Sequence, residues 1–247
     1  MNLTRLGVVL AAGALVTAGC GVSQDVADSD LTATSFGSSV LEAQEKAGTA
    51  HVIVTARTGG LEPELEGDVR VVKGDEAADL SVSAEPVTGG RLIIVDQVLY
   101  LQLRGLTPQG TYAKADPRDP DDAAGQFIGE LLSRVDLSNP IRMFKAVESV
   151  ERGGVERLDG VDTRKYTVTI DPRKAARALG FGARDLGSGP EKPIEYDVWV
   201  DGDDLVRKID FDTRGLHVTV VFTDWGKDVD ISAPPADQVR DRPLISG

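Results

Sequence analysis

The sequence predicts an α+β fold: one curved antiparallel sheet of about ten strands, with helices covering its concave side. Three observations support this prediction. Short segments alternate apolar and polar residues, as strands with one buried face do. The Gly, Pro and Asp breaks between these segments are too short to contain crossover helices, so neighbouring strands must be antiparallel. Two helical patterns interrupt the series near its middle.

A helix is expected first, over residues 36–47. Its apolar positions recur at helical spacing, Ser35 or Ser38 can cap its start, and Gly48 can end it. Strand patterns follow directly, with breaks at Gly59-Gly60, Gly74-Asp75, Gly89-Gly90 and Asp96-Gln97. The predicted strands of this half are residues 51–57, 65–73, 78–85, 91–95 and 98–103.

The middle of the chain predicts two helices that divide the strands into two groups. Asp121 can cap the first helix, and Ser138-Asn139-Pro140 can start the second. A curled sheet has an inside, and the apolar faces of these helices would lie against it. There they would form either an ordinary packed core or an apolar pocket. The candidate ligand-binding residues are therefore Phe127, Ile128, Leu131, Leu132, Ile141, Met143 and Phe144.

The second group of strands shows the clearest alternation. Tyr166, Val168 and Ile170 share one face of a strand, while Thr167 and Thr169 share the other. A short helix over 173–179 and a Gly-rich loop over 180–189 interrupt this group. The predicted strands are residues 147–158, 161–171, 194–201, 205–212 and 216–223.

The first nineteen residues predict a lipoprotein signal peptide. Arg5 precedes an apolar run over 6–16, which is too short for the roughly 20 residues of a membrane-spanning helix. The following Thr-Ala-Gly-Cys resembles the bacterial lipobox, with Thr17 where that motif usually has Leu. Cys20 is the only cysteine, and we expect it to carry the lipid, because a diacylglyceryl group gives stable anchoring. The alternative is an ordinary secreted protein with an incidental cysteine.

This interpretation divides the chain into three parts. Residues 1–19 form the signal peptide, residues 20–34 form a polar, flexible tether, and residues 35–247 form one domain. The protein is then expected on the extracytoplasmic face of the cell membrane, held through its lipidated N-terminus.

Composition and motifs exclude several functions. A net charge of −13 does not suit binding to nucleic acid. Neither His51 nor His217 has a neighbour at metal-ligand spacing, and the Asp-rich residues 116–122 and 201–204 fit turns better than calcium loops. Nucleophile elbows, phosphate-binding loops and a free catalytic thiol are absent from the sequence. Paired carboxylates for glycosidic or peptide cleavage stay open in so acidic a chain, but no pair stands out, so a hydrolase is the least favoured alternative. We predict a non-enzymatic protein without cofactor or metal.

Four segments together resemble the actinobacterial LppX/LprAFG lipoprotein family. These are Leu-Asp-Gly-Val-Asp-Thr-Arg-Lys-Tyr-Thr-Val at 158–168, Tyr-Asp-Val-Trp-Val-Asp at 196–201 with Leu-Val-Arg-Lys at 205–208, Phe-Thr-Asp-Trp-Gly at 222–226, and Val-Asp-Ile-Ser-Ala-Pro-Pro at 229–235. Their order behind a lipobox covers most of the mature chain. The resemblance implies a half-barrel similar to the lipoprotein carrier LolA, with helices over its open side and an apolar cavity.

The resemblance also implies a function. Family members bind acylated lipids or glycolipids, so we expect a membrane-anchored, monomeric lipid-binding protein that could act as a carrier, with a lipid exporter as a candidate partner. The resemblance brings no catalytic residues. An alternative keeps the same fold but makes the protein an envelope sensor or scaffold that binds a protein partner rather than lipid.

Overall fold

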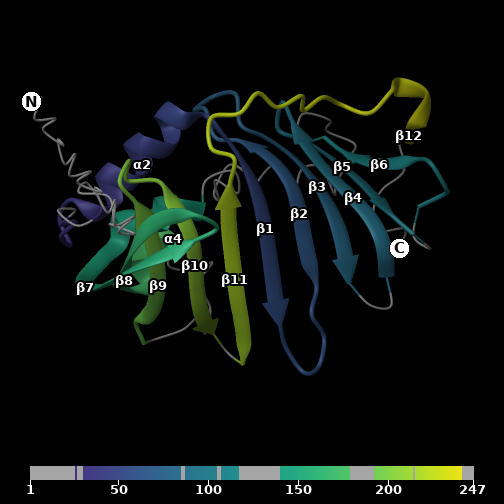
Figure 1. Cartoon of the computed structure of the whole chain (residues 1–247). Helices are drawn as coiled ribbons and strands as arrows, with labels where there is room; N and C mark the ends of the chain where they lie inside the picture. Colours follow the sequence, from purple (N-terminus) through teal and green to yellow (C-terminus); the bar gives the residue numbers. More distant parts are fainter. Residues whose placement is uncertain are drawn as a thin grey trace, which may run out of the picture.

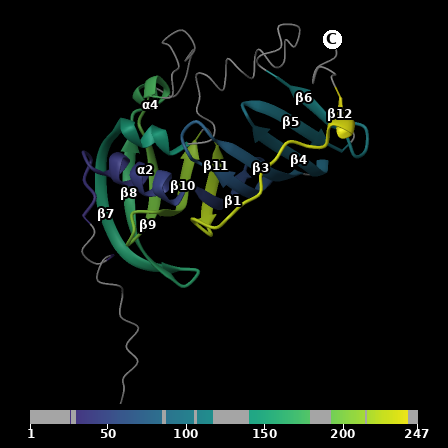
Figure 2. The same cartoon turned by 90° about the horizontal axis from the view of Figure 1, so that it is seen from above.

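A computed structural model describes residues 26, 30–84, 87–104, 107–116, 140–178, 192–213 and 215–240. The described chain is mostly β, with one curved sheet of twelve strands (Figures 1 and 2). The strands are β1 (Thr49–Arg57), β2 (Glu64–Arg70), β3 (Ala77–Ala84), β4 (Val87–Val95), β5 (Val98–Leu103), β6 (Tyr112–Ala115), β7 (Val147–Leu158), β8 (Val161–Ile170), β9 (Ile194–Asp201), β10 (Val206–Thr213), β11 (Leu216–Thr223) and β12 (Val239–Arg240).

The two groups of strands join into one sheet through β1 and β11. The order across the sheet is β12-β6-β5-β4-β3-β2-β1-β11-β10-β9-β8-β7, so β6 and β7, which flank residues 117–139, lie far apart. All ten predicted strands are present. The prediction of about ten antiparallel strands is wrong in two respects, because β6 and β12 were missed and they pair in parallel. A strand of four residues and one of two are too short to show a period-2 pattern.

Four short helical segments of the described chain accompany the sheet. They are α2 (Phe36–Ala47), the 3-10 helix η1 (Pro140–Ala146), α4 (Pro172–Ala178) and the 3-10 helix η2 (Ala236–Gln238). Helix α2 begins and ends as predicted, but the Ser35 side chain makes no cap bond, and its Oγ accepts from the backbone N–H of Thr32 instead. The predicted second mid-chain helix is a 3-10 helix, because apolar spacing over seven residues does not separate 3.6 from 3.0 residues per turn. Within the described chain, no helix is long and apolar enough to cross a membrane.

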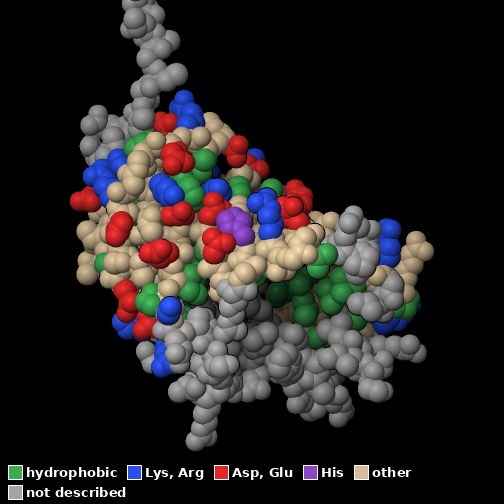
Figure 3. All heavy atoms as spheres, turned by 90° about the horizontal axis from the view of Figure 1, so that it is seen from below, with side chains coloured by type: hydrophobic (Ala, Val, Ile, Leu, Met, Phe, Trp, Pro, Cys, Tyr) green, Lys and Arg blue, Asp and Glu red, His purple; other side chains and the backbone are tan. Residues whose placement is uncertain are grey.

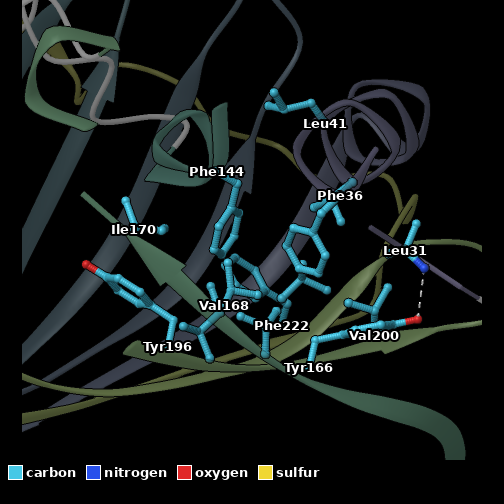
Figure 4. Packing of buried hydrophobic residues seen from close by; sticks show 14 of the residues in the cluster. Leu31, Phe36, Leu41, Phe144, Tyr166, Val168, Ile170, Tyr196, Val200 and Phe222 are labelled. Carbon is cyan, nitrogen blue, oxygen red and sulfur yellow. Dashed lines mark hydrogen bonds between the residues drawn. The ribbon is translucent and has the colours of Figure 1, made fainter. Parts of the chain in front are cut away.

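The hydrophobic core lies between α2, η1 and the inner face of β1 and β8–β11 (Figure 4). The Phe36 ring on α2 meets the Phe144 ring on η1 edge-on at 5.2 Å and the Tyr166 ring on β8 at 5.6 Å. Helix α2 can approach η1 closely because residue 37 is Gly, and a Cβ there would collide with the Phe144 carbonyl. The helices therefore cover the β7 end of the sheet, and no helix of the described chain covers the inner face of β2–β6.

The folded body begins before residue 35, earlier than predicted. Val26 is 1% exposed and its carbonyl accepts a hydrogen bond from Arg164 Nε at 3.1 Å. Leu31 belongs to the core, and its backbone N–H donates to the Tyr166 hydroxyl at 3.5 Å (Figure 4). Two residues of the predicted tether, Val26 and Leu31, are thus part of the packed domain.

Candidate functional site

The inner face of β2–β5 is a continuous surface of aliphatic side chains. The core shows which residues share this face, because Ala50 and Val52 of β1 face the helices. Every second residue of a strand points to the same face, and residues paired across neighbouring strands also share a face. The side chains on this face, here named the aliphatic face, are Leu65, Val69, Leu80, Val82, Leu92, Ile94, Leu99, Leu101 and Leu103.

Cross-strand pairing arranges these side chains in rows. One row runs from Leu80 on β3 through Leu92 on β4 to Leu101 on β5. A parallel row joins Ile94 to Leu99, and its next member, Ala78, is buried. Neighbouring strands lie about 4.8 Å apart, so four strands give a surface roughly 14 Å wide.

The aliphatic face carries no charged or polar side chain, whereas the opposite face is polar on β2 and β3 and mixed on β4 and β5, where Ile93 and Val98 are buried. Glu64, Glu66 and Asp68 project from the outer face of β2, and Asp79 and Arg91 form an ion pair on β3 and β4. All nine side chains of the aliphatic face are only half-buried. Figure 3, which views the molecule from below, shows hydrophobic side chains gathered in a hollow. Half-exposed apolar surface of this extent is typical of a binding site rather than of a closed core.

The predicted ligand-binding residues divide into three groups. Phe144 is 1% exposed and belongs to the core, so the packed-core alternative holds for it, and Met143 packs partly buried against the same cluster. Ile141 lies within η1, but its side chain is not described. The remaining predicted residues, Cys20, Phe127, Ile128, Leu131 and Leu132, lie outside the described residues, as does the predicted loop over 180–189.

The strand residues of the aliphatic face were not among the predicted site residues. Their signal was present in the sequence, because Leu99, Leu101 and Leu103 alternate with Tyr100 and Gln102. Assigning them to one shared surface required the register between strands, which a single sequence does not give.

Polar groups elsewhere in the described chain gather in a depression and in a hairpin. A polar depression of about 250 Å³ lies between the β2–β3 connection and the β4–β5 turn, lined by Gly74, Asp75, Glu76, Asp96 and Gln97. Among the described residues no group of three or more His, Cys, Asp or Glu side chains can hold a metal ion. The Asp-rich hairpin after β9 uses Asp201 to accept the N–H groups of Asp203 and Leu205, and burial raises the pKa of Asp204.

His51 on the outer face of β1 forms a titratable pair with Asp68 on β2. Its Nδ1 lies 2.8 Å from Asp68 Oδ1 and its Nε2 lies 3.5 Å from Glu66 Oε1. The hydrogen bond with Asp68 raises the pKa of His51 above 6.5, although burial opposes the rise. The folded state therefore binds this proton more tightly than the unfolded state. The stabilisation is complete below pH 6.5 and is lost as the pH rises through the folded-state pKa.

We expect His51→Gln to remove this part of the pH dependence. Denaturant unfolding of the wild type should show stability falling between about pH 6 and pH 8 by less than about 1 kcal/mol, because both side chains are partly in water. The variant should show a flatter profile, and His217→Gln on β11 serves as the control. A wild-type stability that rises over this interval would contradict the assignment of His51 as the titrating group.

Comparisons with known proteins agree with this architecture. The chain is 26% identical to the lipoarabinomannan carrier protein LprG of Mycolicibacterium smegmatis over 244 residues, which cover 94% of this chain and 95% of that protein. The LprG of Mycolicibacterium hassiacum is also 26% identical, over 249 residues that cover 94% of this chain and 99% of that protein. No family model matches the chain.

Solved structures share the fold. The lipoprotein LppX of Mycobacterium tuberculosis aligns with a TM-score of 0.58 and 17% identity, covering 81% of this chain and 98% of that one. LprF of Mycobacterium bovis aligns with a TM-score of 0.56 and 17% identity, covering 82% and 96%. The chain is therefore homologous to LprG and shares its fold with LppX and LprF.

Proposed function

We propose that this protein is a membrane-anchored envelope lipoprotein that binds an acylated lipid or glycolipid on the aliphatic face and carries it. The observation that carries the proposal is the wholly apolar, half-exposed inner face of β2–β5. Its nine side chains offer contact to acyl chains, and the absence of polar groups among them removes any penalty for desolvating such groups on binding.

Homology supports the general role. The two relatives of nearly equal length are named lipoarabinomannan carriers, and the chain matches them almost end to end. A carrier needs a surface that holds acyl chains away from water and needs no reactive group, which agrees with the chemistry of the described inner face. Lipid attachment at Cys20 would keep the protein at the membrane that supplies its ligand.

Lipid extraction and mass spectrometry test this proposal. The chain from Gly21 to Gly247 is purified from its host without detergent, because Val26 and Leu31 belong to the folded body. We expect about one molecule of acylated lipid per protein molecule. A protein that emerges free of lipid and does not bind fluorescent fatty-acyl probes would instead favour the sensor or scaffold with the same fold.

A further inference from the structure

Gln44, near the end of α2, is the one polar residue of this helix that is fully buried. It shares a helix face with Val40 and Leu41, because it follows them by four and three residues. Its exposed fraction is 1%, and its side-chain nitrogen Nε2 has no hydrogen-bond partner among the described residues. A buried amide N–H without an acceptor is rare and destabilising in folded proteins, so this one requires an explanation.

The position of Gln44 follows from the ends of α2. The helix starts at the core, where Phe36 contacts Tyr166 of β8, and runs across the inner side of the sheet toward β1 (Figures 1 and 2). At its other end, the Gly48 N–H donates to the Gln44 carbonyl at 2.8 Å, and the Val71 N–H donates to the Gly48 carbonyl at 2.9 Å. The last turn of α2 is thus tied to the start of β1 and the end of β2.

This position lies where the covered part of the inner face meets the aliphatic face. Val69 on β2 and Leu80 on β3 belong to the aliphatic face, and both also pack against the core cluster beneath α2. A ligand lying along the aliphatic face would therefore have its nearest part of α2 at the turn that carries Gln44.

We infer that the Gln44 amide is a polar anchor for the ligand, donating its N–H to a carbonyl oxygen that links an acyl chain to the rest of the lipid. This inference rests on the proposed function. An ester or amide carbonyl fits because it is a neutral acceptor attached directly to hydrocarbon, so it can enter an apolar site at little desolvation cost beyond its one hydrogen bond. Gln44 thereby selects acyl lipids over lipids whose chains are joined by ether bonds.

The test compares dioleoylglycerol, which has two ester carbonyls, with its dioleyl ether analogue, which has the same chains and none. Binding of both lipids is measured by displacement of a fluorescent acyl probe from wild type and from Gln44→Met, whose unbranched side chain has similar length. Gln44→Leu is measured in parallel, so that a packing fault in one variant does not decide the result. Glu45→Met, on the exposed side of the same turn, is the control.

We expect wild type and Glu45→Met to prefer the ester lipid by about five- to tenfold, the value of one hydrogen bond. Both Gln44 variants should bind the two lipids within twofold of each other and retain their affinity for the ether. Without lipid they should unfold at the same temperature as wild type or a few degrees higher, because the unpaired N–H is gone.

Three different failures are distinguishable. A wild type that binds the ester and the ether equally well overturns the role of Gln44 and leaves the proposed function intact. A wild type that binds neither lipid overturns the proposed function, and the role of Gln44 falls with it. Gln44 variants that lose stability and keep the ester preference would show that the amide serves the fold alone.

Discussion

Replacing Phe36 by Ala should cost about 3–5 kcal/mol of the free energy of unfolding, the range for a fully buried aromatic side chain. Phe36 is 0% exposed, and its ring joins η1 and β8 through edge-on contacts with Phe144 and Tyr166. Its loss would leave a cavity where α2 is held against the sheet. Urea unfolding and thermal unfolding measure the effect, and the midpoint should fall by about 10 °C or more.

Leu61→Ala is the matched control for this prediction. Leu61 is 54% exposed, so its truncation should change stability by less than about 0.5 kcal/mol. A loss below about 1 kcal/mol in Phe36→Ala would show that the contact between α2, η1 and β8 is loosely packed. The core would then not hold the neighbouring aliphatic face rigidly in place.

The second large effect concerns lipid content rather than stability. Leu101→Glu places a charge in the middle row of the aliphatic face, between Leu92 and Ala113. We expect bound lipid to fall at least tenfold, because acyl chains cannot solvate a carboxylate. The protein should remain folded, since Leu101 is half-exposed and water can reach the new charge. Extracted lipid and thermal unfolding are measured on the same preparation.

Gln102→Glu gives the control at the next residue of β5. It adds the same charge to the same strand, but on the outer face, because successive side chains of a strand point to opposite faces. Its lipid content should equal that of the wild type. Equal lipid loss in both variants, or unfolding of Leu101→Glu alone, would show that the inner face of β5 is a closed core and not a binding surface.

The fold was largely predictable from the sequence because its strands carry the period-2 pattern along most of their length. Val161 to Ile170 alternates buried and half-buried residues, as does the start of β9, whereas Trp199 and Asp201 on the outer face of β9 are buried as well. Hairpin breaks such as Asp159-Gly160 mark strand ends, with positive φ at both residues. Strand β12 has two residues, and only its contact with β6 defines it.

The candidate site was less predictable for a physical reason. Apolar residues at helical spacing, such as Ile141 to Phe144, are easily recognised in the sequence and were predicted to bind the ligand. The structure places Phe144 in the core. The aliphatic face is made instead of residues from four strands, each contributing two or three side chains. The aliphatic face is continuous because of the register between its four strands, and it is half-exposed because α2 ends before reaching it. Neither the register nor the position of α2 can be read from a short segment of the sequence.

The hydrogen bond from Arg164 to the Val26 carbonyl limits the distance between the folded domain and a lipid on Cys20. Val26 is the sixth residue after Cys20, and six extended residue steps span at most roughly 20 Å. With the lipid on Cys20, the part of β8 that carries Arg164 stays close to that distance from the bilayer, however the domain turns. Under the proposed function, the protein would therefore not shuttle across the envelope. It would collect and deliver its lipid beside the anchoring membrane, and an acceptor would have to come to it there.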